Sequence, residues 1–203
     1  MAFDIFLIPH DDESARSWFQ RIKEFRLFSL QAAPDAFSST YAREIAFTDD
    51  VWYGRLLNPD AFTFVALQSS RVVGSLALVG TLPSRPEERT PLANPSLQNS
   101  RDTAAPGTEP EASHWRINGM FVLPEARGQG VAKGLIEKSI VFGCERAVLS
   151  GKEFIASIAV DDDNLPAKSL YEKCGFVTVG EEPLAPGSPR TVRLMTYIPK
   201  VGA

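Results

Sequence analysis

The chain has 203 residues, 44% of them hydrophobic, and a formal net charge of −4. This length and apolar content predict a single globular domain that spans residues 1–203. Without clustered Lys and Arg, and without an apolar run of about 20 residues, the sequence is typical neither of nucleic-acid-binding nor of membrane-spanning proteins.

The N-terminus has neither a basic segment nor a small-residue cleavage site, so we expect a cytoplasmic protein, with a nuclear location left open. The chain has two cysteines, Cys144 and Cys174, and two histidines, His10 and His114, and their spacing fits no zinc site. We therefore expect no metal, and we expect both thiols to be small buried side chains in a reducing compartment.

The predicted elements begin with a strand at residues 3–8 and a helix that starts at the acidic residues 11–14. A second helical stretch is expected after residues 37–40 and a third at 48–57. Residues 61–67 and 72–80 are strand-like, and the polar turn between them predicts an antiparallel hairpin.

Residues 81–113 are rich in Pro, Ser, Glu, Asn and Thr and nearly lack aromatic residues. Such a segment buries too little apolar surface to offset its ordering entropy, which predicts a mobile insertion within the domain. A linker between two domains is the alternative, although neither flank looks complete alone.

The second half alternates strands and helices. Strands are expected at 114–123, 154–160, 176–179 and 191–198, and helices at 131–145 and 165–174. Together with the first half, this predicts a mixed α/β (α+β) fold, in which helices flank a sheet of about seven strands.

Residues 127–132, Arg-Gly-Gln-Gly-Val-Ala, separate a predicted strand from a predicted helix. A P-loop is excluded because Gly134 and Leu135 occupy its Lys and hydroxyl positions, and Lys133 replaces the small residue of a dinucleotide fingerprint. Free backbone N–H groups at a helix N-terminus still predict a pyrophosphate site, and a glycine-rich turn without a ligand is the alternative.

The same residues match the Gln/Arg-x-x-Gly-x-Gly/Ala signature of the GCN5-related N-acetyltransferase (GNAT) superfamily, with Val122-x-Pro124 at the customary distance upstream. Further on, Asn164-x-x-Ala167-x-x-Leu170-Tyr171-Glu172-Lys173-x-Gly175-Phe176 is similar to the helix and turn of that family. The chain thus resembles this superfamily over about residues 118–180. Residues 3–80 match only in element order, and the insertion is atypical.

The resemblance implies a sheet splayed between its fourth and fifth strands and acetyl-coenzyme A (acetyl-CoA) as co-substrate. Its pantetheine would pair with the backbone of a β-strand, and its pyrophosphate would accept hydrogen bonds from the backbone N–H groups of residues 127–132. The cofactor-binding residues implied are Met120, Phe121, Val122, Arg127, Gly128, Gln129, Gly130, Val131, Ala132, Asn164, Ala167 and Tyr171.

By the same resemblance Tyr171 is the catalytic acid toward the thiolate, with core packing as the alternative. Proton transfer from a phenol to a thiolate is uphill by roughly 2 kcal/mol, so Tyr171 would act mainly as a hydrogen-bond donor. The usual strand glutamate is missing from residues 114–119, His-Trp-Arg-Ile-Asn-Gly. His114 is therefore the candidate base, and an ordinary strand-edge histidine is the alternative.

The implied function is an acetyl-CoA-dependent N-acetyltransferase that acts on a primary amine of a small molecule or peptide. The alternatives are a coenzyme-binding regulatory module of the same fold and a longer acyl donor. The acidic chain and Asp161–Asp163 fit a cationic acceptor, although both also suit a solvated surface. Glu44, Asp49, Trp52 and Tyr53 lie where the family builds its acceptor pocket and do not identify the acceptor. We expect no nucleic-acid or membrane partner, and a homodimer stays open.

Overall fold

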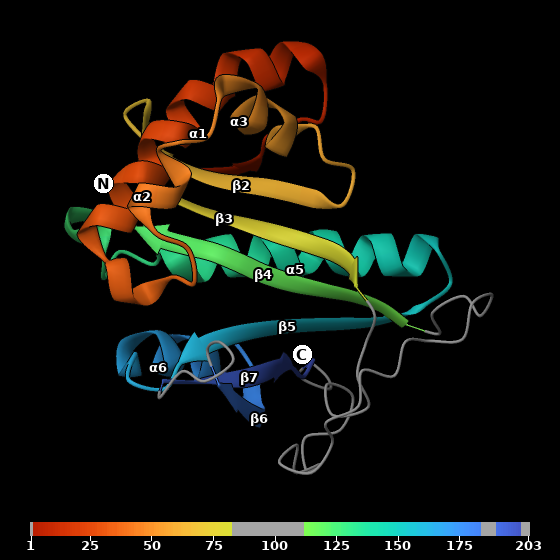
Figure 1. Cartoon of the computed structure of the whole chain (residues 1–203). Coiled ribbons are helices and arrows are strands. Elements are labelled where there is room, and N and C mark those ends of the chain that lie inside the picture. Colours follow the sequence, from red (N-terminus) through yellow and green to blue (C-terminus); the bar gives the residue numbers. More distant parts are fainter. Residues whose placement is uncertain (1, 83–111, 184–189, 200–203) are drawn as a thin grey trace. The chain divides into compact units, whose positions relative to one another are not determined.

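The computed structural model describes residues 2–82, 112–183 and 190–199 (Figure 1). Its strands form one seven-stranded mixed sheet in the order β1-β2-β3-β4-β5-β7-β6, which confirms the predicted fold class. The elements are β1 (Asp4–Leu7), α1 (Asp12–Ala32), η1 (Pro34–Ala36), α2 (Tyr41–Glu44), α3 (Asp49–Leu56), β2 (Ala61–Gln68), β3 (Arg71–Leu82), β4 (Ala112–Val122), η3 (Pro124–Ala126), α5 (Val131–Leu149), β5 (Glu153–Asp161), α6 (Leu165–Lys173), β6 (Phe176–Pro183) and β7 (Thr191–Tyr197).

The chain divides into two compact units, which are described separately. The first unit comprises Met1–Val79 and Asn118–Ser139, and the second comprises Gly80–Ile117 and Ile140–Ala203, each without the residues that the structure leaves undescribed. The division falls within β3, β4 and α5 rather than at the predicted insertion. The single domain therefore stays a prediction.

The first unit is built on antiparallel pairs. β1 pairs with β2, and β2 pairs with β3 from Ala61↔Val79 to Gln68↔Arg71, which confirms the predicted hairpin. Helix α1 begins where Asp11 accepts a hydrogen bond from the amide of Ser14 at 2.7 Å. It packs with α3 against β1 and β2 through a core of Ile8, Ala15, Leu56 and Val65.

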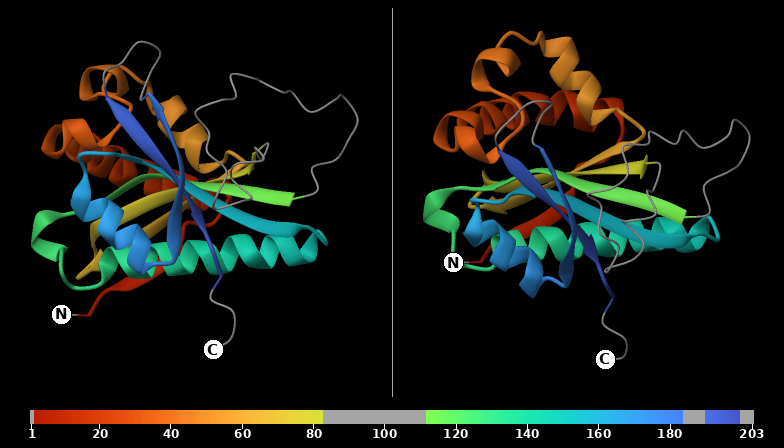
Figure 2. Two further views of the ribbon diagram at one scale, coloured as in Figure 1. Left: turned by 90° about the horizontal axis from the view of Figure 1, so that it is seen from below. Right: turned by 60° about the horizontal axis from the view of Figure 1, so that its bottom comes forward.

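The first half of α5 covers the opposite face of these strands (Figure 2). Glycines permit the close approach. A Cβ on Gly74 in β3 would lie 2.9 Å from Val131, and one on Gly134 in α5 would lie 2.7 Å from Ile5. A larger residue at either position would force these neighbouring side chains to move, so the two glycines allow the start of α5 to lie close to the sheet.

The second unit contains a parallel pair and two antiparallel ones. β4 runs parallel to β5, with a register from Ala112↔Glu153 to Ile117↔Ile158. β7 lies between β5 and β6 and is antiparallel to both. Helix α6 packs on β6 through an edge-to-face contact between Tyr171 and Phe176, whose ring centroids are 6.2 Å apart.

Several sequence predictions need correction. β3 continues to Leu82 and β4 begins at Ala112, so both ends of the predicted insertion are strand, and Ala112 and Ser113 are buried. Residues 83–111, the rest of that predicted insertion, lie outside the described part of the chain. The expectation of two buried thiols is wrong: Cys144 is exposed on α5 and Cys174 is only half-buried.

Candidate active site

The glycine-rich segment connects η3 to α5 in the first unit. Gly128 has φ +73° and Gly130 has φ +87°, and no atom lies within 4 Å of where a Cβ would stand on either residue. The positive φ, and not a lack of space in the protein, is therefore what requires glycine. The two residues turn the chain so that α5 starts at Val131, which is buried against β3.

The backbone donors of this segment have no acceptor in the described chain. The first amide bound across the start of α5 is that of Gly134, which donates to the carbonyl of Gly130 at 2.9 Å. The amide of Arg127 already donates to Pro124 at 3.2 Å. The amides from Gly128 to Lys133 are left free, at the positive end of a 19-residue helix.

Side chains around the segment hold it in place. Arg127 folds back so that its Nε donates to the carbonyl of Val122 at 3.1 Å. Gln129 donates to the carbonyl of Glu125 at 2.9 Å and accepts a longer bond of 3.4 Å from Gln68 of β2. Arg71 forms an exposed ion pair with Glu125 at 2.9 Å. The segment is thus tied to the β2–β3 hairpin.

Met120, Phe121 and Val122 lie at the end of β4, beyond the part of the strand that pairs with β5. The ring of Phe121 is buried in an aromatic cluster with Phe25, Phe28 and Phe37, at centroid distances of 6.0–6.4 Å. A cavity of about 420 Å³ adjoins this cluster. Its lining residues are Arg21, Glu24, Phe25, Phe28, Ser70, Arg71, Val72 and Leu123.

Tyr171 in α6 is 6% exposed, and its hydroxyl has no hydrogen-bond partner among the described residues. Burial, with a smaller contribution from nearby Cys174, raises the pKa of Tyr171 well above its ordinary value. The phenol therefore stays protonated at neutral pH. It can donate a hydrogen bond, whereas full proton transfer is less favourable than for a free tyrosine.

Asn164 is the N-cap of α6, because its side-chain oxygen accepts from the amide of Ala167 at 3.3 Å. The side-chain NH₂ of Asn164 has no partner in the described chain. The residue therefore has a structural role and still carries free donors. The sequence resemblance had implied only the binding role.

His114 is fully buried in β4, in the second unit. Its Nε2 lies 2.7 Å from the hydroxyl of Ser157 in β5, which also accepts a bond from Nε of Arg116 at 3.2 Å. β4 lies between β3 and β5, so His114 is not the strand-edge residue of the alternative interpretation. Sequence reasoning missed Ser157 because only the parallel register brings it opposite β4.

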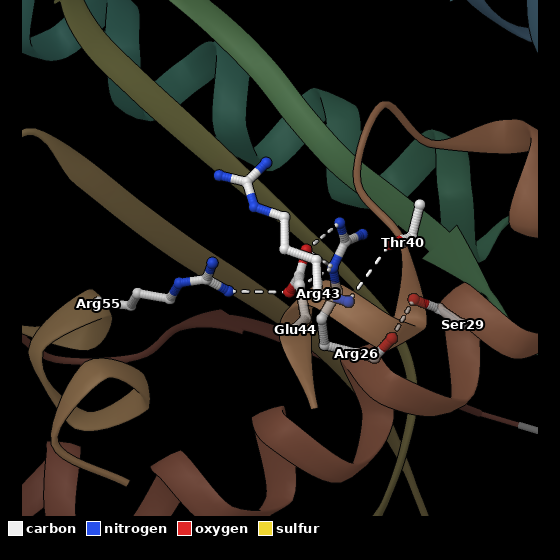
Figure 3. A network of polar contacts seen from close by, with 6 residues as sticks. All are labelled: Arg26, Ser29, Thr40, Arg43, Glu44 and Arg55. Carbon is white, nitrogen blue, oxygen red and sulfur yellow. Dashed lines mark hydrogen bonds and ion pairs between the residues drawn. The ribbon is translucent and has the colours of Figure 1, made fainter. Parts of the chain in front are cut away.

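A network of ionic groups surrounds Glu44 in the first unit (Figure 3). Glu44 is 2% exposed, and its carboxylate accepts from Nη2 of Arg26 at 2.9 Å and from Nη1 of Arg55 at 3.0 Å. Burial opposes its ionisation, but hydrogen bonds from Arg26, Ser39 and Arg55 and the charge of Arg26 lower the pKa of Glu44 to about 2. No pattern in the sequence indicated these arginine partners.

The other residues nominated for the acceptor have local partners. Asp49 pairs with Lys23 at 2.7 Å, and the hydroxyl of Tyr53 bonds to Asp12. In the second unit, Asp161 pairs with Arg190 and Asp162 with Arg193. Arginines therefore compensate much of the charge of this acidic run, which weakens the case for a cationic acceptor there.

The predicted site residues are divided between the two units. Met120–Val122 and Arg127–Ala132 belong to the first unit, and His114, Asn164, Ala167 and Tyr171 to the second. Within residues 2–82, 112–183 and 190–199, no group of His, Cys, Asp and Glu has the geometry of a metal site. No helix in those residues is long and apolar enough to cross a membrane.

Comparisons with a family model and with solved structures both give acetyltransferases of one family. A family model described as "Acetyltransferase (GNAT) family" matches residues 26–176. Comparison with curated proteins by sequence gives no match. Among solved structures, a GNAT-family acetyltransferase from Streptococcus pneumoniae superposes with a TM-score of 0.63 at 15% identity, covering 96% of this chain and 98% of that one.

Of two further similar structures, one contains bound acetyl-CoA and the other is an enzyme named for its substrate. NAA60 of Arabidopsis thaliana in complex with acetyl-CoA has a TM-score of 0.63 at 15% identity, covering 97% of this chain and 98% of that one. A chimera of the spermidine N-acetyltransferase SpeG of Vibrio cholerae and hSSAT has a TM-score of 0.57 at 14% identity, covering 98% and 96%. At these identities the similarity establishes the fold alone.

Proposed function

Since the chain belongs to the acetyltransferase (GNAT) family, we propose that it is an acetyl-CoA-dependent N-acetyltransferase that acts on a primary amine of a small molecule or peptide. The observation that carries this proposal is the row of free amides from Gly128 to Lys133 at the N-terminus of α5. Oriented donors at a helix N-terminus bind a pyrophosphate without needing side chains.

The coenzyme supplies a thioester, which an amine attacks through a tetrahedral intermediate. The residues of this chain bind the coenzyme and orient its thioester. Amides at 128–132 hold the pyrophosphate, and backbone groups of Met120, Phe121 and Val122 pair with the pantetheine as another strand would. Support for the second role comes from the register of β4 with β5, which ends at Ile117 before these residues begin.

Tyr171 donates a hydrogen bond to the sulfur as negative charge develops on it. Its hydroxyl has no partner in the described chain, and its raised pKa keeps the proton on the oxygen. Asn164 directs its free side-chain NH₂ toward the pantetheine, with Ala167 beside it in the first turn of α6. An amide of β4 near Val122 stabilises the oxyanion.

His114 is the proposed base. Because the imidazole is completely buried beside Ser157, it would take up the proton through this hydroxyl rather than by direct contact with the amine. An unchanged pH–rate profile in His114→Asn, in a protein that still folds, would remove His114 from the mechanism. We also propose a cytoplasmic location, with a nuclear one left open, and no metal, nucleic-acid or membrane partner.

A thiol-release assay tests the proposal. Acetyl-CoA is mixed with a panel of primary amines and short peptides, and free coenzyme A is measured for the natural chain and for Tyr171→Phe. We expect turnover, with kcat lower by about tenfold to a hundredfold in the variant, because one charge-assisted hydrogen bond is lost. The ring contact with Phe176 is retained, so the melting temperature serves as the folding control.

Two results would contradict the proposal. Equal kcat for the natural chain and Tyr171→Phe would exclude the role of the hydroxyl. Binding of acetyl-CoA without release of thiol across the whole panel would favour the regulatory module. Comparing acetyl-CoA with longer acyl donors in the same assay decides which acyl group is transferred.

A further inference from the structure

The ionic network around Glu44 carries more positive than negative charge. Arg26 of α1 and Arg55 of α3 share the single carboxylate of Glu44, and Arg43 precedes Glu44 in α2. The guanidinium of Arg43 points away from Glu44 and has no partner among the described residues (Figure 3). The carboxylate of Asp49 accepts from Lys23 and Gln20 and not from these arginines. Arg26 and Arg55 thus share one anion, and Arg43 adds a third cation without a counter-ion in the described chain.

The guanidinium groups of Arg26 and Arg55 are held in place by aromatic rings. Cζ of Arg26 lies 4.4 Å from the centroid of Phe37. Cζ of Arg55 lies 4.8 Å from the centroid of Phe47 and 4.6 Å from that of Trp52. Arg55 remains 44% exposed and uses one of its donors on Glu44. Orienting a guanidinium in this way lowers the entropy cost of binding an anion.

One donor of the network is unpaired and buried. Nη1 of Arg26 is shielded from solvent and has no hydrogen-bond partner among the described residues. It lies 3.6 Å from where a Cβ would stand on Gly119, which is exposed in β4 and has φ +61°. A buried, charged N–H without an acceptor costs free energy, which an oxygen atom entering beside Gly119 would recover.

This donor lies beside the strand segment that is proposed to bind the coenzyme. Gly119 immediately precedes Met120–Val122, which under the proposed function align the thioester. We propose that Arg26, Arg43 and Arg55 recognise a carboxylate on the acceptor, so that the enzyme prefers amines with a carboxylate close to the reacting nitrogen. This inference rests on the proposed function. A cationic acceptor such as a polyamine would meet like charges at this position and be disfavoured.

The test compares acceptors that differ in one carboxylate. The first pair is L-leucine and L-leucinamide. The second pair is two short peptides that differ only in their first residue, Glu or Gln. kcat/KM is measured by thiol release for the natural chain, for Arg26→Lys and for Arg43→Gln. Arg16→Gln, which removes an exposed arginine on another part of α1, is the matched control. Melting temperatures report folding.

For at least one pair, we expect the natural chain to prefer the carboxylated acceptor by about tenfold or more in kcat/KM. Arg26→Lys and Arg43→Gln should each reduce this preference by about tenfold, because each removes about one charge-assisted hydrogen bond. Arg16→Gln should keep the full preference. The two amines of a pair differ in pKa, which affects the preference measured for each protein. The change in preference between a variant and the natural chain is independent of this difference, because the same acceptors are compared throughout.

The remaining outcomes separate the two proposals. Turnover without a carboxylate preference, or with a preference that all variants retain, would overturn this inference and leave the acetyltransferase intact. If no acceptor releases thiol, binding of N-acetyl-L-leucine and its amide is measured by calorimetry. Binding that requires both the carboxylate and the arginines would support this inference, while the missing thiol release would contradict the proposed activity. Equal binding of both compounds would overturn the inference.

Discussion

At the scale of single residues, the backbone angles of Gly128 and Gly130 shape the proposed pyrophosphate site. Their positive φ values turn the chain so that consecutive amides emerge at the start of α5 without acceptors. The sequence predicted free backbone N–H groups and a pyrophosphate site at this point. What the structure adds is that the protein itself leaves the space around both Cβ positions open.

Gly130→Ala should therefore lose both stability and ligand binding. An L-residue at φ +87° is strained, so the free energy of unfolding should fall by about 1–2 kcal/mol. The Kd of acetyl-CoA should rise at least about tenfold as the amides move. Urea unfolding and calorimetry measure the two effects.

Gly54→Ala is the matched control for that substitution. Gly54 lies inside α3, has no positive φ, and has nothing within 4 Å of a Cβ. Alanine should leave binding unchanged and stabilise α3 by up to about 1 kcal/mol. If both variants behaved alike, the left-handed backbone at Gly130 would have no part in the site.

At the scale of elements, α2 is a single turn whose position depends on one buried ion. Helix propensity cannot hold four residues, so the ion pairs of Glu44 with Arg26 and Arg55 anchor α2 to α1 and α3. These pairs also orient the arginines to which we assign acceptor recognition. The periodicity of the sequence located the helical stretch but gave no indication of its anchor.

Glu44→Gln should destabilise the protein by about 3 kcal/mol at pH 7, because two partly buried cations lose their counter-ion. The pKa of Glu44 in the folded chain, about 2, lies below its value in the unfolded chain. Its contribution is thus complete above about pH 5 and is lost as the pH falls toward 2. The difference in free energy of unfolding between natural chain and variant should shrink over this range.

Urea unfolding at several pH values measures this difference. Glu137→Gln is the control, because Glu137 is exposed and contacts Lys133 only at 3.6 Å. Its difference from the natural chain should stay below about 0.5 kcal/mol at each pH. A difference for Glu44→Gln that is independent of pH would show that the ionised carboxylate is not what anchors α2.

At the scale of the whole molecule, the net charge does not describe the charge around the proposed acceptor site. The chain carries −4 overall, and its acidity fits a cationic partner. Yet the acidic run at Asp161–Asp163 is largely paired with arginines, while the cluster around Glu44 has an excess of positive charge. Over a few ångströms, local pairs and not the net charge set the potential that a ligand meets.

Coenzyme binding should stabilise the whole fold. A ligand at a hundred times its Kd adds about 2.7 kcal/mol to the free energy of unfolding, which for a chain of this size raises the melting temperature by roughly 5–10 °C. A thermal scan with acetyl-CoA measures this shift. Pantetheine at the same concentration is the control, since it lacks the pyrophosphate. Equal stabilisation by both would exclude the amides of 128–132 as the phosphate site.

The sequence by itself determined the elements and the family. Hydrophobic periodicity, helix caps and the glycine signature are local properties, so they located the β2–β3 hairpin, α5 and the GNAT motif within a few residues. Errors arose where local composition competes with packing, as at the ends of β3 and β4 and at Cys144.

Only the tertiary structure decided which side chains meet. Ser157 reaches His114 through the parallel register of β4 and β5, and Arg26 and Arg55 reach Glu44 because α1, α2 and α3 pack together. These pairs lie 11 to 43 residues apart in the chain. No local pattern records such contacts, since they depend on the burial of distant apolar surfaces that brings the elements into contact.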